Sequence, residues 1–235
     1  MALASGGWRR IEAPNPLSWK LAVAALVVTL GGAAPDAGLD QERAGHGRPF
    51  PPEDLGLLEG PDRDAWQKPG QIMDALGIAD GSVVADIGAG GGWFTVRLAR
   101  RVGPQGLVFA EDVQRQMLDA IERRVRREVL ANVRTVLGKD DDPMLPAGQL
   151  DAVLMVDAYP EVTNRVGLLA NIRKSLKPSG RLGIVDFRKD GGGPGPALDL
   201  RVDPEQVVED ARAVGLRLIA HERFLPFQYL LVFGY

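Results

Sequence analysis

The sequence contains no cysteine and only two histidines, His46 and His221. The missing cysteine excludes disulfide bridges, thiolate zinc sites, iron–sulfur clusters and a cysteine nucleophile. Two histidines are too few for a histidine-rich metal centre, so we predict no metal site. The lack of thiols does not decide the redox compartment, because a protein without thiols tolerates either one.

An excess of positive charge is also missing. The 235 residues carry 28 Lys and Arg against 31 Asp and Glu, a net charge of -3. Such a chain has no bulk attraction for nucleic acid or for an anionic membrane. It also has no Asn-Pro-Pro-Tyr-type motif, and no thiol that could attack a pyrimidine ring. We therefore expect a small-molecule substrate rather than a nucleic acid.

No apolar run reaches the length of about 20 residues that a transmembrane helix needs. The longest such stretch here, LAVAALVVTL at residues 21–30, follows Arg9, Arg10 and Lys20 and precedes small residues. A basic flank, a short apolar run and small residues together are typical of a signal peptide. A buried helix and a wrongly assigned start codon are the alternatives. We predict a signal peptide or membrane anchor over residues 1–34.

This N-terminal segment allows two locations for the protein. A cleaved signal would export it, whereas the donor cofactor proposed below is made in the cytoplasm. The positive-inside tendency keeps the basic flank on the cytoplasmic side, and a short apolar run can lie in the membrane interface without crossing. We expect either a cytoplasmic, membrane-associated protein or an exported one.

The rest of the chain divides into a linker and one domain. Residues 35–65 are rich in glycine, proline and charge, without a sustained period, as in a linker. From residue 66 to 235, strand and helix patterns alternate. We expect strands at 82–87, 106–110, 133–137, 150–156, 181–187, 216–223 and 229–233, and helices at 94–102, 113–129, 162–176 and 204–214.

This alternation predicts an α/β fold with a doubly wound, mostly parallel seven-stranded sheet. The run at 150–156 is almost continuously apolar, which is typical of a central strand. The last two strands are too close in sequence for a parallel crossover, which needs a dozen or more residues. The final strand must therefore be antiparallel.

A glycine-rich turn joins the strand at 82–87 to the helix after it. It reads Asp86-Ile87-Gly88-Ala89-Gly90-Gly91-Gly92. Glycines there permit positive φ and a close approach of ligand to backbone, and ligands bind at the carboxyl ends of such strands. Asp112, at the end of the next strand, is placed to bind ribose hydroxyls. The alternatives are a turn without a ligand and an N-cap for the following helix.

Two other nucleotide motifs do not match this turn. In the dinucleotide pattern G-x-G-x-x-G, counted from Gly88, the third glycine position is occupied by Trp93. No G-x-x-x-x-G-K-[ST] phosphate loop occurs either. A nicotinamide-dependent oxidoreductase is therefore the least favoured of the enzyme classes considered.

Four segments, in order, resemble the motifs of class I S-adenosylmethionine-dependent methyltransferases. They are VVADIGAGGGWFTVRLA, LVFAEDVQRQML, VLGKDDDPMLPAGQLDAVLMVDAYPEV and LKPSGRLGIVDF. The resemblance spans Trp66 to Tyr235 and is strongest to small-molecule and quinone-type enzymes, including exported or anchored bacterial members. It implies methyl transfer from S-adenosylmethionine to a small or lipophilic acceptor. A module that binds the cofactor without performing the chemistry is the alternative.

The resemblance also assigns roles to individual residues. Asp86 would orient the glycine turn, and Asp112 would accept hydrogen bonds from both ribose hydroxyls. The methionine part and ribose would lie against the backbone of Gly88, Gly90 and Gly92.

The third matching segment carries the remaining predicted roles. Asp140 or Asp141 would meet the adenine amino group, although the acidic run could equally be a solvated turn. Asp157 would face the methionine moiety and the methyl group. We predict Asp157 and Tyr159 as catalytic, with Glu161 a third candidate base. Many relatives carry a histidine where this chain has proline at position 160, so a histidine base is absent from that position.

Overall fold

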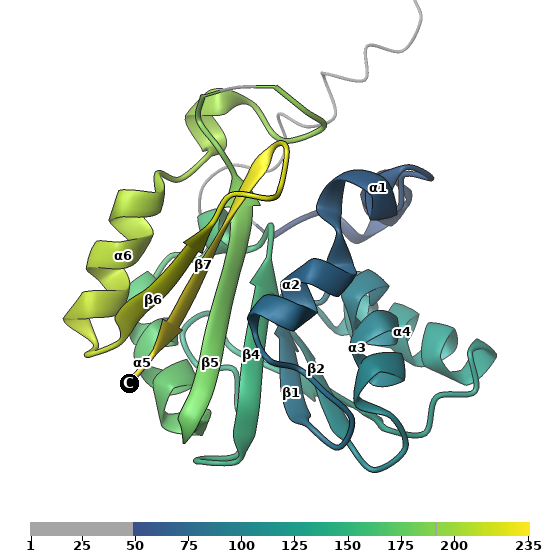
Figure 1. The fold of residues 1–235 in the computed structure, drawn as a ribbon. Coiled ribbons are helices and arrows are strands. Elements are labelled where there is room, and N and C mark those ends of the chain that lie inside the picture. The colour runs from purple at the N-terminus through teal and green to yellow at the C-terminus, as the bar shows by residue number, and fades with distance from the viewer. Residues whose placement is uncertain (1–48, 191) are drawn as a thin grey trace, which may run out of the picture. The chain divides into compact units, whose positions relative to one another are not determined.

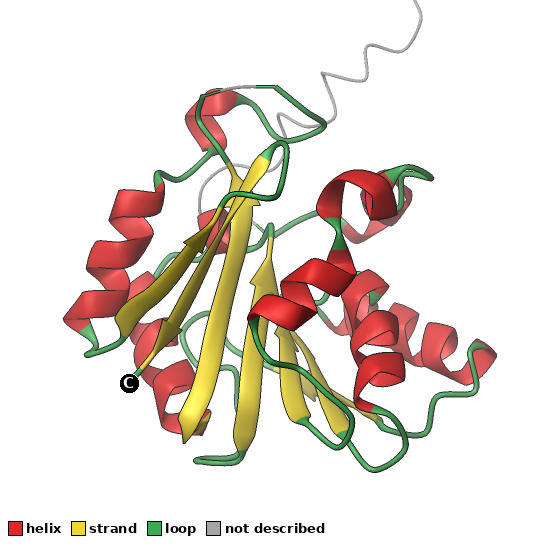
Figure 2. Cartoon of the chain, in the orientation of Figure 1, coloured by secondary structure: helices red, strands yellow, loops and turns green. Residues whose placement is uncertain are grey.

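The computed structural model describes residues 49–190 and 192–235, so the predicted signal or anchor at 1–34 lies outside the described residues. The described chain forms one seven-stranded sheet in the order β3-β2-β1-β4-β5-β7-β6, with helices on both faces (Figures 1 and 2). Strands β1 to β5 pair in parallel, and β7 lies antiparallel between β5 and β6. The predicted doubly wound sheet is confirmed.

The elements follow the predicted order closely. The strands are β1 Val83–Ile87, β2 Leu107–Asp112, β3 Val133–Leu137, β4 Leu150–Val156, β5 Leu176–Phe187, β6 Arg217–Glu222 and β7 Gln228–Gly234. The helices are α1 Arg63–Gln67, α2 Pro69–Ala75, α3 Trp93–Val102, α4 Arg115–Arg127, α5 Arg165–Ser175 and α6 Pro204–Ala213. Short 3-10 turns lie at η2 Pro52–Leu58, η3 Tyr159–Glu161 and η4 Leu198–Leu200.

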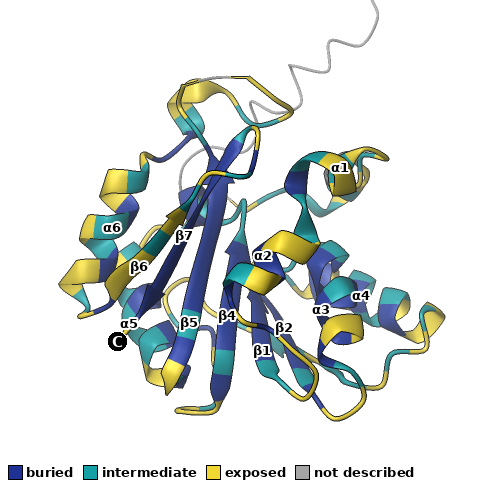
Figure 3. Ribbon diagram, viewed as in Figure 1, coloured by how far each residue is buried: buried dark blue, intermediate teal, exposed yellow. Residues whose placement is uncertain are grey.

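Both faces of the sheet are buried, because successive side chains of a strand point to opposite faces. In β4, for example, Val153 packs with α5 and α6, whereas Leu154 packs with α2 and α3. Helix α4 covers the β2 and β3 end of the face that α2 and α3 occupy. Strand β4 and residues 182–187 of β5 are almost fully buried (Figure 3). This burial on two faces explains why these strands are nearly continuous apolar runs.

The strand order reverses direction between β1 and β4. The chain leaves β1 towards β2 and β3, and later returns through β4 to β5. In open α/β sheets, ligands bind at the carboxyl ends of the two strands that flank such a switch point. Gly88 follows β1 and Asp157 follows β4, so the topology brings the glycine turn and the fourth-strand motif to one place.

The structure corrects the predicted linker. Residues 49–65 do not run free of the domain; they include η2 and the start of α1 and contact it through charged pairs. Glu59 pairs with Arg124 of α4, and Asp64 accepts three hydrogen bonds from Arg97 of α3. The folded domain therefore begins before residue 66.

The boundary between α5 and β5 also differs from the sequence prediction. Helix α5 ends at Ser175, and β5 begins at Leu176, so Lys177 to Gly180 belongs to the strand. The register between β4 and β5 shifts between Leu150 and Ala152 to accommodate the added residues. Within the described residues, no helix combines the length and apolar character needed to cross a membrane.

Candidate functional site

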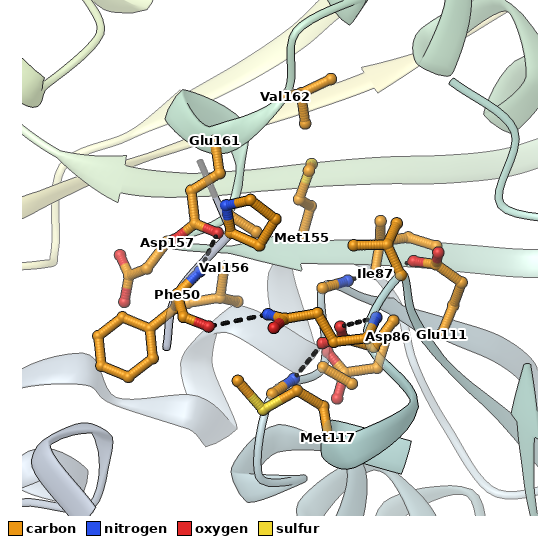
Figure 4. A pocket seen from close by; sticks show the side chains of 18 of the residues that line it. Phe50, Asp86, Ile87, Glu111, Met117, Met155, Val156, Asp157, Glu161 and Val162 are labelled. Carbon is orange, nitrogen blue, oxygen red and sulfur yellow. Dashed lines mark hydrogen bonds between the residues drawn. The ribbon is translucent and has the colours of Figure 1, made fainter. Parts of the chain in front are cut away.

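A cavity of about 230 Å³ opens at the carboxyl ends of β1, β2 and β4 (Figure 4). The glycine turn forms one side, and the segment after β4 forms the other. Among the lining side chains are an apolar group, Ile87, Met155, Val162 and Leu168, and an acidic group, Asp86, Glu111, Asp112, Asp140, Asp157 and Glu161. Such a cavity suits a ligand that is partly apolar and partly cationic.

The glycine turn requires glycine for two separate reasons. Gly88, Gly90 and Gly92 have φ values of 64°, 54° and 78°, in the left-handed region that L side chains rarely adopt. At Gly88, a β-carbon would also lie 2.6 Å from the β-carbon of Ala158, which follows β4. The two strand ends at the switch point thus approach so closely that no side chain fits between them.

Asp112 ties the end of β2 to the glycine turn. Its Oδ2 accepts a hydrogen bond from the Gly90 amide at 3.0 Å, and its Oδ1 accepts one from the Gln114 amide at 2.9 Å. Burial raises the pKa of this carboxyl above its usual value. A carboxylate oxygen has more than one acceptor position, so Asp112 fixes the turn and can still bind a ligand hydroxyl. Asp112 is not the N-cap of α4, because that helix begins at Arg115 with Gln114 at the N-cap position.

Two further buried acids lie beneath the turn. Asp86 accepts a hydrogen bond from the Thr95 hydroxyl at 2.6 Å, and burial raises its pKa to about 7. Glu111 accepts the Gly88 amide at 3.3 Å, and burial raises its pKa to about 8. Asp86 therefore links the turn to α3, consistent with the orienting role predicted for it. Glu111 was not predicted, because neighbouring Asp112 already accounted for the acidic end of β2.

Asp157 lies at the end of β4 and has a positive φ of 58°, which is uncommon outside glycine. Its carboxylate accepts hydrogen bonds from Gln67 at 3.2 Å and from Gln228, and Arg63 lies 3.7 Å away. Burial raises the pKa of Asp157 to about 6, and the Arg63 charge opposes that rise. Three donors from α1 and β7 therefore hold this half-buried side chain at the cavity wall.

Tyr159 does not line the cavity. It is fully buried between the sheet and the helices, and its hydroxyl donates to Asp210 of α6 at 2.7 Å. Burial and the Asp210 carboxylate both raise the pKa of the phenol, so it remains protonated. The structure thus places this predicted catalytic residue in the core, and it has no part in the mechanism derived below. Its side chain points towards α6, which the local sequence around residue 159 does not reveal.

The acidic run at 140–142 divides between two environments. Asp140 lines the cavity. Asp141 lies outside that lining; its side chain accepts from Asn164 at 3.2 Å and its carbonyl accepts from Asn171 at 2.7 Å. Of the two residues predicted to meet adenine, Asp140 is the one that a ligand in the cavity can reach. Gly92 is likewise outside the lining and begins α3, against Ile121.

Phe50 bridges the mouth of the cavity, a contact that the sequence did not indicate. Its amide donates to Oε2 of Glu161 at 3.0 Å, and its carbonyl accepts from the Gln114 side chain at 2.8 Å (Figure 4). The two partners stand after β4 and after β2, on opposite sides. Burial raises the pKa of Glu161 to about 7.

Comparison with known proteins agrees with this geometry. Residues 84–180 match a family model described as a methyltransferase domain. Over these residues the chain is similar to a methyltransferase domain. A ubiquinone/menaquinone biosynthesis C-methyltransferase UbiE from Pasteurella multocida is 31% identical over 118 residues, covering 50% of this chain and 44% of that protein. The Idiomarina loihiensis protein of the same name is 30% identical over 125 residues, covering 53% and 49%.

Solved structures place the methyltransferase fold over a larger part of the chain. A SAM-dependent methyltransferase from Aquifex aeolicus is 24% identical, with a TM-score of 0.75, covering 78% of this chain and 98% of that one. A structure titled as the [4+2]-cyclase SpnF has a TM-score of 0.63 at 17% identity, covering 76% and 84%. This chain spans about half the length of the curated relatives it matches.

The cofactor of this domain type is S-adenosylmethionine, and the residues of the cavity fit it. The turn at Gly88 and Gly90 presents backbone without side chains, which a close-lying ligand requires. Asp112 would supply acceptors for ribose hydroxyls. Asp86 and Asp157 suit a ligand that carries positive charge. Burial raises the pKa of both carboxyls, and a nearby cation would favour their ionised form.

Proposed function

We propose that this protein transfers the methyl group of S-adenosylmethionine to a small lipophilic ring, of the hydroquinone class. The observation that supports this proposal is the composition of the cavity. The glycine turn with Asp112 lies on one side of it, and apolar side chains lie on the other. Bound S-adenosylmethionine would supply an electrophilic methyl group on a positively charged sulfur. The names of the UbiE relatives support a quinone-like acceptor, and the apolar group of the lining is compatible with a flat ring.

The protein contributes mainly position and exclusion of water. Holding two reactants in line can supply about 7–11 kcal/mol at best. Asp112 and the glycine turn would fix one reactant, while Phe50 and the 3-10 turn η3 cover the space beside it. Arg63 and two glutamines hold the Asp157 carboxylate in a fixed position, so it contributes negative charge to the cavity rather than carrying a proton.

Transfer to a simple hydroquinone tests this proposal. The protein is incubated without oxygen with 1,4-naphthalenediol and S-adenosylmethionine that carries a trideuterated methyl group, and the products are separated by mass. We expect a ring-methylated product that holds all three deuterium atoms. A protein that binds S-adenosylmethionine yet methylates no hydroquinone would instead be a cofactor-binding module. The [4+2]-cyclase SpnF has a similar fold, so the fold alone does not decide the reaction.

We also propose that the active protein stays on the cytoplasmic side, associated with the membrane through its N-terminal segment. The basic residues before the apolar run at 21–30, and the cytoplasmic supply of the cofactor, support this location. Cell fractionation with N-terminal sequencing tests it. We expect an intact N-terminus in the membrane fraction, and a mature chain that starts at Pro35 in the periplasm would contradict the proposal.

A further inference from the structure

The acids around the cavity differ in how many partners they have. Asp112 accepts two backbone amides, and Asp157 has three donors from α1 and β7. Glu111 is held under the turn against Gly88 and Gly138. Both oxygens of Asp112 and of Asp157 are thus engaged, and Glu111 is held against the glycine turn. A carboxylate that accepts a proton from a substrate needs an oxygen that such contacts leave open.

Glu161 has such an oxygen. Its Oε2 accepts the Phe50 amide at 3.0 Å, whereas its Oε1 has no hydrogen-bond partner among residues 49–190 and 192–235. The side chain lines the cavity on the same side as Met155 and Val162 (Figure 4), and the apolar Leu168 belongs to the same lining. An apolar ring against this wall therefore lies beside a carboxylate that has one oxygen without a hydrogen-bond partner among the described residues.

Resting on the function proposed above, we infer that Glu161 is the residue that accepts the hydroxyl proton of the acceptor ring. The O–H proton passes to Oε1 of Glu161, and the electron pair of the O–H bond remains on the ring. The ring carbon beside the hydroxyl forms a bond to the methyl carbon, and the pair of the broken sulfur–carbon bond stays on sulfur. Loss of the proton from that ring carbon and return of one to oxygen restore the hydroquinone, with one net proton released.

The charges around Glu161 match this role. Asp112, Asp157 and Asp186 face it from β2, the end of β4 and β5, and each disfavours its ionised form. Burial, followed by the charges of Asp112 and Asp157, raises the pKa of Glu161 to about 7, and the hydrogen bond from the Phe50 amide opposes this rise. A base whose pKa is near the working pH combines a sufficient ionised fraction with enough basicity. A bound sulfonium would favour the ionised form and move the acidic limb of the pH profile to 7 or below.

The decisive variant is Glu161→Gln. Its side-chain carbonyl can still accept the Phe50 amide, so the cover of the cavity is kept while the proton acceptor is lost. The matched control is Glu209→Gln, an exposed position on α6 outside the cavity. Affinity for S-adenosylhomocysteine, kcat/KM with 1,4-naphthalenediol and the pH profile are measured for both variants and for wild type.

We expect Glu161→Gln to keep its S-adenosylhomocysteine affinity within a factor of about three, and to lose about 10²–10⁴-fold in kcat/KM together with the acidic limb. The loss should shrink for a more acidic hydroquinone, such as the 2-nitro derivative, which needs less help with deprotonation. Glu209→Gln should match wild type. A Glu161→Gln protein with wild-type kcat/KM, or with an equal loss for both acceptors, would overturn the role of Glu161 alone. Wild type that binds the cofactor but methylates neither acceptor would overturn the proposed function as well.

Discussion

At the scale of single residues, the site depends on side chains that bind the backbone of the glycine turn. Asp112 accepts the amides of both Gly90 and Gln114, so one carboxylate joins the end of β2 to the turn after β1. Glu111 and Asp86 brace the same turn from below. The backbone of the turn, which is proposed to hold the cofactor, is thus held in place by three acids.

Replacing Asp112 with Ala removes the predicted ribose acceptor. We expect S-adenosylhomocysteine to bind more weakly by about 1.5–3 kcal/mol, the range for hydrogen bonds to a charged group. Quenching of tryptophan fluorescence can report the affinity, because Trp93 lines the cavity. A variant that loses stability but binds the ligand as tightly as wild type would show that Asp112 only supports the turn.

The close approach at Gly88 can be separated from its backbone conformation. Gly88 and Gly77 have similar φ values, 64° and 67°, but a β-carbon at Gly77 meets nothing within 4 Å. We expect Gly77→Ala to cost about 1–2 kcal/mol from the left-handed conformation alone. Gly88→Ala should cost at least about 1 kcal/mol more, because Ala158 must move. Urea unfolding measures both costs. Equal costs would mean that Ala158 moves away from position 88 without a measurable loss of stability.

The sequence predicted these residues where their role is local. The roles of the glycines in a strand-to-helix turn, and of an acid at the end of the next strand, can be inferred from the residues adjacent to them in the sequence. The sequence motif led us to expect Tyr159 at the cavity. Its side chain points elsewhere, because it hydrogen-bonds to Asp210 of α6, 51 residues away. Glu161 could be proposed as a base but not chosen, since only folding shows which acids are already engaged.

At the scale of elements, the segment from η2 to α1 closes the site from the N-terminal side. Arg63 of α1 lies near Asp157 and over the ring of Trp93, whose centroid is 4.4 Å from the guanidinium carbon. Arg97 stacks on the same ring at 3.4 Å while binding Asp64. Helix α1 is therefore attached to α3 mainly by arginine contacts to one indole and one carboxylate.

This attachment predicts a selective effect on local opening. Arg97→Met removes the contact with Asp64. Arg100→Met, a change on the same helix α3, removes an ion pair with Glu128 at the end of α4. Exposed pairs contribute at most about 1 kcal/mol. Amide hydrogen exchange in residues 63–67 should therefore rise by a few-fold in Arg97→Met and remain unchanged in Arg100→Met. Equal exchange in both variants would refute the docking role of Arg97.

The sequence predicted the central elements better than this covering segment. In β1 and β4, burial on both faces leaves a continuous apolar run that any reader of the sequence can find. Residues 49–65 instead fold through pairs such as Glu59 with Arg124, 65 positions apart, and their composition alone resembles a linker. Long-range charge pairing leaves no periodic trace in the sequence.

At the scale of the whole molecule, the buried acids make the cofactor-free protein sensitive to pH. The folded-state pKa values of Asp86 and Glu111, about 7 and about 8, lie above their ordinary values of 3.8 and 4.5. Between these limits the folded state binds more protons than the unfolded state. Its stability is therefore greatest at low pH within this range and falls as the pH rises towards about 8.

We expect the free energy of unfolding without ligand to drop by about 5 kcal/mol between pH 5.5 and 8.5, because the two carboxyls together lose about four pH units of stabilisation. Urea unfolding at the two pH values measures this drop. Glu111→Gln should flatten the dependence, because it removes one of the raised pKa values, while the exposed Glu209→Gln should not. Stability that rises over this interval would show that these carboxyls are not buried as described.

Cofactor binding is the claim on which the rest of the account depends. Calorimetric titration of the full chain with S-adenosylmethionine, and separately with NAD, tests it most directly. The account predicts a one-to-one complex with S-adenosylmethionine of micromolar or tighter Kd, which Asp112→Ala weakens, and no heat from NAD. Binding of NAD, or no binding of S-adenosylmethionine at millimolar concentration, would contradict it.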